Sequence, residues 1–315
     1  MNFDRIFKEN RQPIIAAFAL FLIVVTLSFS SEYFWTVGNV FNIGKQASIN
    51  LIIALGMTVV IISAGIDLSV GSLLALTISV TAVLGIANEM NIVLAAFIAI
   101  VLTVAAGTLN GVIIQYGKVP AFIATLGTMG VARGVVLLIS SGNPSMSFPS
   151  PFLWIADGKI IGIPFPILLS LVMVIATVIL LKYTRLGREI YAIGGNEEAA
   201  RLSGINIPFV RIVTYSLSGF CCAIAGIVFA ARVGAAPPSA GVGYELNAIA
   251  AVIIGGTSLS GGRGNVMGTV VGAFLMAVIS NGLNIIDVDP YWQGIVIGTI
   301  IVFAVMMSNL RSGNR

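Results

Sequence analysis

Histidine is absent from this sequence, cysteine occurs only twice, and charged residues make up just 9% of the chain. The two cysteines, Cys221 and Cys222, are adjacent inside an apolar run, which excludes the usual zinc sites and disulfide frameworks. The chain also lacks a Gly-x-Ser-x-Gly motif and paired carboxylates that could activate water, which argues against an intramembrane hydrolase. We therefore expect no catalytic residue, metal or cofactor on this chain.

The scarcity of charge also excludes a soluble domain, in which about a quarter of the residues are charged. Hydrophobic residues make up 58% of the chain and the mean hydropathy is +1.06, as expected of an integral membrane protein. The 35 glycines against 3 tryptophans favour closely packed helices over a membrane β-barrel. The sequence pI is about 9.2, but the basic residues are spread among loops, so we expect no nucleic-acid partner.

Apolar runs long enough to span a bilayer predict an all-α, polytopic membrane protein with about ten transmembrane helices in one domain, 1–315. Basic residues precede the first run, which we expect to remain as an uncleaved helix. Glycine and serine predict broken helices near 65–72 and 256–264. The ten runs are 13–30, 46–65, 70–88, 92–115, 120–141, 164–182, 211–232, 245–258, 266–284 and 291–308.

The distribution of lysine and arginine predicts the orientation, because cytoplasmic loops hold the excess of positive charge. With the N-terminus inside, twelve basic residues fall in the cytoplasm and three outside. We therefore expect both termini and the 183–211 loop in the cytoplasm, and the 141–164 loop outside. The cytoplasmic residues are Arg5, Lys8, Arg11, Lys118, Lys182, Arg185, Arg188, Arg201, Arg211, Arg263, Arg311 and Arg315, and the external ones are Lys45, Lys159 and Arg232.

The longest polar interruption, 183–211, carries the signals of a short helix. Asn196 is a good N-cap, acidic residues follow in the first turn, and Gly204 can end the helix. A solvated connector between two membrane helices is the alternative, although a connector needs no capped helix. We expect a helix from about Asn196 to Ser203 that includes Glu197, Glu198, Ala199, Ala200 and Arg201.

Three motifs in this chain resemble those of a known family. Glu198-Ala-Ala-x-x-x-Gly204 resembles the coupling segment by which permeases of ATP-binding-cassette importers dock on their ATPase. Gly65-Ile-Asp-Leu-Ser-Val-Gly-Ser72 and the stretch 243–262 are similar to segments of ribose-type monosaccharide permeases. The likeness covers about residues 40–310.

The resemblance implies the transmembrane permease subunit of an ATP-driven importer for ribose or a similar monosaccharide, located in the bacterial inner membrane. It also implies a second, identical permease copy, a cytosolic ATPase that holds ATP and Mg, and a periplasmic or extracellular sugar-binding protein. Gly262-Arg-Gly does not continue into Gly-Lys-Ser/Thr, so the ATPase must be another chain. The implied coupling residues are Asn196, Glu197, Glu198, Ala199, Ala200, Arg201 and Gly204.

An ion-coupled secondary transporter of a small polar solute is the alternative function. Such a transporter should carry a relay of intramembrane Asp, Glu or His, whereas Asp67 stands nearly alone. Asp67 has two interpretations: the N-cap of a helix beginning near Leu68, or a polar element of the pathway or inner gate. Other candidates for a pathway that suits an uncharged sugar are Ser69, Asn110, Thr125, Asn247, Ser258 and Asn281.

Two further features concern the outer half of the protein. Arg133 lies within an apolar run, so we expect it to face the bundle and to find an acceptor, for which Glu245 is the nominated carboxylate. The proline-rich 141–164 loop predicts a rigid, partly apolar outer surface. That loop is either a docking site for a binding protein or a plain connector.

Overall fold

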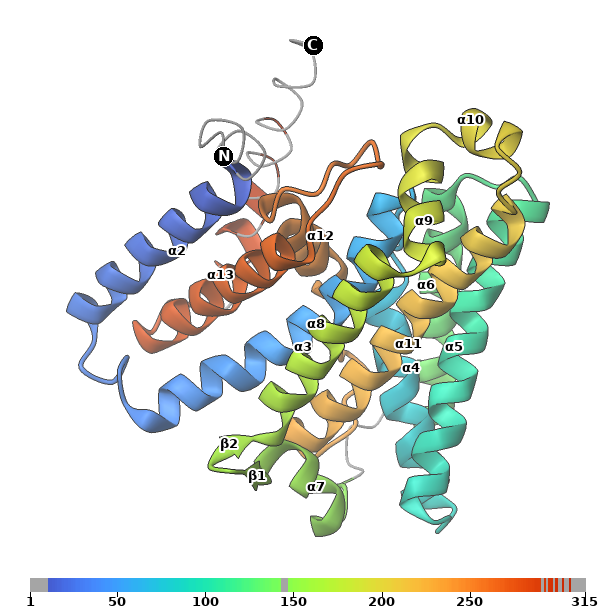
Figure 1. The fold of residues 1–315 in the computed structure, drawn as a ribbon. Helices are drawn as coiled ribbons and strands as arrows, with labels where there is room; N and C mark the ends of the chain where they lie inside the picture. Colours follow the sequence, from blue (N-terminus) through green and yellow to red (C-terminus); the bar gives the residue numbers. More distant parts are fainter. Residues whose placement is uncertain are drawn as a thin grey trace.

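The fold is an all-helical bundle, seen in a computed structural model that describes residues 11–142 and 147–289, with single residues and short stretches between 292 and 306 (Figure 1). Within these ranges eight helices are long and apolar enough to cross a membrane. Most of the tenth predicted run, 291–308, lies outside the described residues. The eight are α2 (Arg11–Ser30), α3 (Val37–Ile62), α4 (Val70–Ala82) with the π-helical turn η1 (Val83–Ala87), α5 (Ile92–Tyr116), α6 (Ala121–Ser140), α8 (Phe165–Tyr183), α11 (Ile207–Val233) and α13 (Val266–Ile285).

Helix α3 is the centre of the bundle. It packs against α8, α11, α12 (Tyr244–Ile254) and α13, and most of its length is buried (Figure 1). By contrast α2 exposes apolar side chains such as Phe18 and Phe21, which suits a surface that faces lipid. A bundle with apolar residues both inside and outside is what the composition predicts for a membrane protein.

Glycines let α5 and α11 approach backbone to backbone. A Cβ atom at Gly107 would lie 2.6 Å from the carbonyl oxygen of Tyr215, and one at Gly219 would lie 2.9 Å from that of Thr103. Such contacts leave no room for a side chain, so these two positions require glycine. Close packing through small residues is the usual way in which membrane helices associate.

Two interruptions of the helices fall where the sequence predicts breaks. Residues 63–69 separate α3 from α4, and residues 255–265 separate α12 from α13. Helix α12 has 11 residues and is about 16 Å long at 1.5 Å per residue, which is too short to cross a bilayer core of about 30 Å. The 245–258 run is therefore not a full crossing helix.

The predicted start of the second helix was wrong. We placed it near residue 46 because 31–43 is polar and aromatic, but α3 begins at Val37. Thr36 is its N-cap, and the Thr36 hydroxyl accepts a hydrogen bond from the backbone N–H of Asn39 at 3.4 Å. Asn39 also forms a reciprocal amide pair with Asn281 of α13, at 2.8 and 3.2 Å, so tertiary contacts support this polar first turn.

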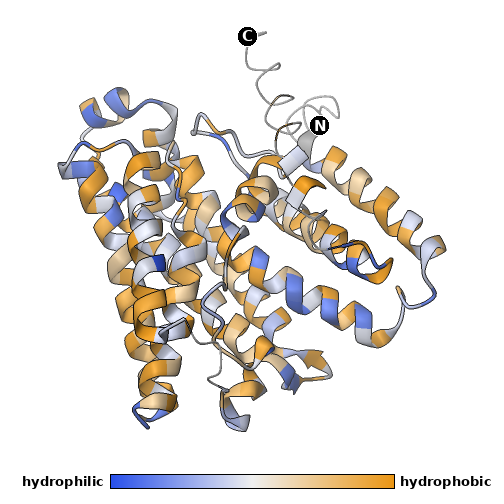
Figure 2. Ribbon diagram, turned by 180° about the vertical axis from the view of Figure 1, so that it is seen from behind, coloured by the Kyte–Doolittle hydropathy of each residue, from blue (hydrophilic) through white to orange (hydrophobic). Residues whose placement is uncertain are grey.

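The two long polar loops lie at opposite ends of the bundle (Figure 1). One end carries α9 (Arg185–Gly195) and α10 (Glu197–Leu202), where hydrophilic residues gather (Figure 2). The other carries α7 (Ser150–Asp157) and a hairpin of β1 (Lys159–Ile160) and β2 (Ile163–Pro164), in which Ile160 pairs with Ile163. Residues 150–164 of the 141–164 loop thus form a short helix and a hairpin, and its use as a docking site or as a plain connector stays a prediction.

Candidate functional site

Helix α9 holds the polar 183–211 segment against the bundle. Its N-cap is Thr184, whose hydroxyl accepts a hydrogen bond from the backbone N–H of Gly187 at 3.1 Å. Ile190 and Ile193 are buried, and the hydroxyl of Tyr191 donates to the carbonyl oxygen of Gly264 at 2.9 Å. Burial raises the pKa of Tyr191, so the phenol stays protonated and can keep donating.

Helix α10 confirms the predicted capped helix. The side-chain oxygen of Asn196 accepts a hydrogen bond from the backbone N–H of Ala199 at 3.0 Å. At the other end Gly204 has a φ of +78°, and the N–H of Ile205 donates to the carbonyl oxygen of Ala200 at 3.2 Å. The helix thus begins and ends through local signals that the sequence contains.

One residue of α10, Ala200, faces the bundle rather than a partner as we expected. Ala200 was expected to contact a partner, but its side chain is only 4% exposed and packs into this chain's own core. Ala200 therefore seats α10 on the bundle. Ala199 is exposed, and Leu202 is 81% exposed, so these two residues offer apolar contact to another molecule.

The charged residues of α10 have partners within this chain. Arg201 contacts both carboxylate oxygens of Glu198, at 2.6 and 2.7 Å. Glu197 accepts a hydrogen bond from Arg211 of α11 at 2.5 Å, and Arg211 also donates to Gln115 of α5 at 2.7 Å. Exposed pairs of this kind add little stability, but the second one ties α10 to two membrane helices.

Asp67 is fully buried in the loop between α3 and α4, and of our two interpretations the N-cap of a helix beginning near Leu68 is wrong, whereas the pathway or gate element stays a prediction. Helix α4 begins at Val70, so Ser69 occupies the N-cap position, and its side chain makes no capping bond. Asp67 instead accepts hydrogen bonds from the N–H and the hydroxyl of Ser69, at 3.0 and 2.5 Å. Its other oxygen accepts from the hydroxyl of Ser218 in α11 at 2.7 Å.

These bonds extend into a chain of buried and partly buried side chains that reaches α6. Asn110 of α5 donates to the hydroxyl of Ser69 at 3.0 Å, and Thr128 of α6 donates to the side-chain oxygen of Asn110 at 2.5 Å. Burial raises the pKa of Asp67, and the hydrogen bonds from Ser69 and Ser218 oppose that shift. We call Asp67, Ser69, Asn110, Thr128 and Ser218 the Asp67 network.

The Asp67 network contains three of the predicted pathway residues, together with Thr128 and Ser218, which we did not predict for the pathway. Ser218 had no sequence signal, because serine on a packed membrane helix is common. The remaining candidates lie elsewhere. Thr125 bonds to its own helix, Asn281 pairs with Asn39, Ser258 lies in the loop after α12, and Asn247 of α12 has a buried side-chain oxygen without a hydrogen-bond partner among the described residues.

Arg133 finds an acceptor, as predicted, but the acceptor is not Glu245. Its guanidinium donates to the carbonyl oxygens of Pro238 and Ala240, at 2.5 and 2.9 Å. The carboxylate of Glu245 instead accepts from the backbone N–H of Gly243 at 3.2 Å. The carbonyl groups of the irregular 234–243 segment are free to accept because that segment forms no regular helix. Arg133 thus joins the 234–243 segment to α6 by hydrogen bonds.

We expect Arg133→Leu to lower the thermal stability of the protein, because the two carbonyl oxygens lose their charged donor. Losing a hydrogen bond to a charged group costs about 1.5–3 kcal/mol. The melting temperature of the protein in detergent, monitored by size-exclusion chromatography after heating, measures the loss. Arg133→Lys keeps a donor and should lose less, whereas an unchanged melting temperature for Arg133→Leu would show that these bonds contribute nothing.

Two cavities flank the bundle at its opposite ends. One has a volume of about 450 Å³ and lies between α10, the loop before Asp67 and the loop between α5 and α6. Its lining is Ser63, Ala64, Gly65, Ile114, Gln115, Lys118, Val119, Pro120, Ala121, Glu197, Arg211 and Tyr215.

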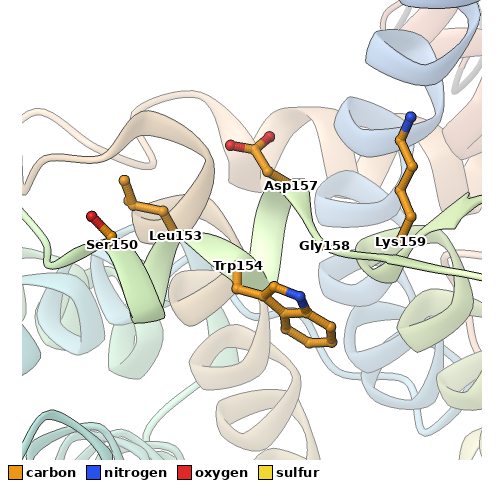
Figure 3. A pocket seen from close by; sticks show the side chains of 6 residues that line it. All are labelled: Ser150, Leu153, Trp154, Asp157, Gly158 and Lys159. Carbon is orange, nitrogen blue, oxygen red and sulfur yellow. The ribbon is translucent and has the colours of Figure 1, made fainter.

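The second cavity, about 530 Å³, lies beside α7 at the other end (Figure 3). Figure 3 shows Trp154 and Asp157 projecting from opposite sides of that short helix. Asp157 accepts from the ammonium of Lys45 in α3 at 2.7 Å, which anchors α7 to the bundle. Among the described residues there is no cluster of His, Cys, Asp or Glu that could hold a metal ion.

Comparison with known proteins places the chain in a family. Residues 39–305 match the family described as "Branched-chain amino acid transport system / permease component". The chain is 46% identical over 312 residues to the ribose import permease protein RbsC of Escherichia coli K12, covering 98% of this chain and 96% of that protein. No solved structure gives a significant match.

Two further relatives differ in the sugar that they are named for. Identity is 42% over 297 residues to the D-allose transport system permease protein AlsC of Escherichia coli K12, covering 94% of this chain and 91% of that protein. It is 35% over 362 residues to the xylose transport system permease protein XylH of the same strain, covering 95% and 92%. The resemblance found in the sequence motifs is confirmed: the chain belongs to this permease family and is a multi-pass membrane component that does not itself hydrolyse ATP.

Proposed function

We propose that this chain is the transmembrane subunit of an ATP-driven importer that carries ribose or a similar monosaccharide across the bacterial inner membrane. The observation that carries the proposal is α10, a capped helix with an exposed apolar face, in a chain 46% identical to a ribose import permease. In this proposal α10 and α9 dock on a cytosolic ATPase, which holds ATP and Mg. Both termini are cytoplasmic, and two identical permease copies form the pathway.

A sugar substrate suits the chain better than an amino acid, despite the name of the matching family. The three relatives cited above are named for ribose, allose and xylose. A zwitterionic amino acid would need charged partners along its route, whereas the buried polar side chains of the described residues are amides and hydroxyls with Asp67 as the one charged exception. Amides and hydroxyls match the hydroxyl groups of a neutral sugar.

At the outer end, α7, the hairpin and the cavity beside Trp154 form the docking surface for a sugar-loaded binding protein (Figure 3). The Lys45–Asp157 bond supports this assignment because it fixes α7 to the central helix α3. A binding protein that presses on α7 would therefore act directly on the core of the bundle.

At the inner end, the Asp67 network acts as a gate element rather than as a lining of the pathway. All of its polar groups named above already have partners inside the protein, so a sugar could bind them only by breaking those bonds. Ser218 lies on α11, which follows α10 directly in the chain. A movement of α10 would therefore reach Asp67 through α11.

Proteoliposomes test the proposed function. Permease reconstituted with its ATPase, supplied with ribose-loaded binding protein, should take up ribose only when ATP is present on the ATPase side. Leucine in place of ribose should give no uptake. Uptake by the permease alone, driven by a proton or sodium gradient without ATP, would instead establish an ion-coupled secondary transporter.

A further inference from the structure

The loop between α12 and α13, residues 255–265, lies beside α9 at the end of the bundle that carries α10 (Figure 1). Two hydrogen bonds fix it there. The N–H of Gly262 donates to the carbonyl oxygen of Ile62, the last residue of α3, at 2.9 Å. The hydroxyl of Tyr191 in α9 donates to the carbonyl oxygen of Gly264 at 2.9 Å.

Glycines bring this loop and the end of α9 into backbone contact. A Cβ atom at Gly261 would lie 2.8 Å from the carbonyl oxygen of Gly194, and one at Gly262 would lie 2.7 Å from the Cα atom of Gly195. Gly261 and Gly262 also have positive φ angles, +80° and +69°, which side chains disfavour. The loop and α9 therefore form one rigid unit, because backbone atoms cannot shift as flexible side chains can.

Arg263 projects from this rigid unit without a partner. It is exposed, and no ion pair or side-chain hydrogen bond involves it among the described residues. The acidic residues of α10, Glu197 and Glu198, are already paired with Arg211 and Arg201. Arg263 therefore adds an uncompensated positive charge to the surface beside α10.

We propose that residues 256–264 are a second docking element for the ATPase, in which Arg263 contacts an acidic group of that partner. The inference rests on the proposed function, since it takes α10 as the first docking element. The loop joins α12 to α13 and is bonded to the end of α3. A docked ATPase would therefore act on α3, α12 and α13 as well as on α8 and α11, which flank α9 and α10.

The rigid attachment favours a protein partner over the lipid surface. A membrane attracts exposed basic residues through diffuse charge and needs no fixed position for them. Here hydrogen bonds and glycine contacts hold the backbone on either side of Arg263 against α9, the helix that directly precedes α10. A protein partner with a complementary surface can contact α10 and this loop at the same time only if their relative positions are fixed.

Reversal of the charge tests this inference. The dissociation constant of the purified ATPase for the full permease in nanodiscs of neutral lipid should rise about tenfold for Arg263→Glu, as for the loss of an interfacial ion pair. Arg263→Lys should stay within about threefold of wild type, since it keeps the charge. Lys159→Glu makes the same change of charge at the opposite end of the bundle, on the surface proposed for the binding protein. It should leave the dissociation constant of the ATPase unchanged.

The outcomes separate this inference from the proposed function. If Arg263→Glu binds the ATPase as tightly as wild type while Leu202→Glu binds it about tenfold more weakly or worse, α10 is a docking element and the loop is not. If the wild-type permease itself shows no affinity for the ATPase, the proposed function fails. If Arg263→Glu weakens binding only in nanodiscs that contain anionic lipid, the residue contacts lipid, and the inference is overturned.

Discussion

Leu202→Glu is expected to abolish ATP-driven uptake while leaving the permease folded. Leu202 is 81% exposed on α10, so the substitution removes little contact within this chain. On a partner it would replace an apolar contact by a carboxylate that must lose its water. Burial of a leucine side chain is worth about 1.5–3 kcal/mol, so binding of the ATPase should weaken about tenfold or more.

Matched variants at α10 distinguish docking from folding. Leu202→Met conserves volume and polarity and should bind the ATPase within about threefold of wild type. Ala200→Arg alters the buried face of α10 and should lower the yield of folded permease as well as ATPase binding. Wild-type binding and uptake by Leu202→Glu would show that α10 does not meet the ATPase.

Asp67→Leu is expected to lose both folded yield and uptake. The N–H of Ser69 and the hydroxyl of Ser218 would lose their acceptor in a fully buried setting. Each buried donor left without a partner costs about 1–3 kcal/mol. The yield of monodisperse protein after extraction from the membrane, together with its melting temperature, measures this loss.

Asp67→Asn should be tolerated far better than Asp67→Leu. The asparagine oxygen can still accept from the N–H of Ser69, and the hydroxyl of Ser218 can turn to accept from the amide nitrogen. The Asn variant should therefore fold and transport at a reduced rate. If it folds and binds the ATPase but transports nothing, the charge of Asp67 is itself required and the hydrogen-bonding account is wrong.

The sequence predicts α10 well because all of its signals are local. Asn196 caps it, acidic residues fill its first turn and Gly204 ends it, each within a few residues of the helix. The start of α3 could not be predicted in this way. Its polar first turn is supported by Asn281, which lies 242 residues away in the chain.

The partners of the buried charges were also beyond the reach of the sequence. Asp67 has an obvious local use as a cap, but its hydroxyl partner Ser218 comes from a helix 151 residues further on. Arg133 was matched to Glu245 because both are charged, whereas backbone carbonyls of an irregular segment are its acceptors. Side-chain chemistry predicts that such groups need partners, and only the fold decides which ones they find.

Cross-linking from α10 tests the central claim most directly. The two native cysteines are buried, so Leu202→Cys would place the accessible thiol among the described residues on the exposed face of α10. A thiol-reactive photo-cross-linker attached there should join the permease to its ATPase in membranes, whereas Lys159→Cys at the opposite end should not. Efficient labelling of residue 202 without any cross-link to the ATPase would contradict the account.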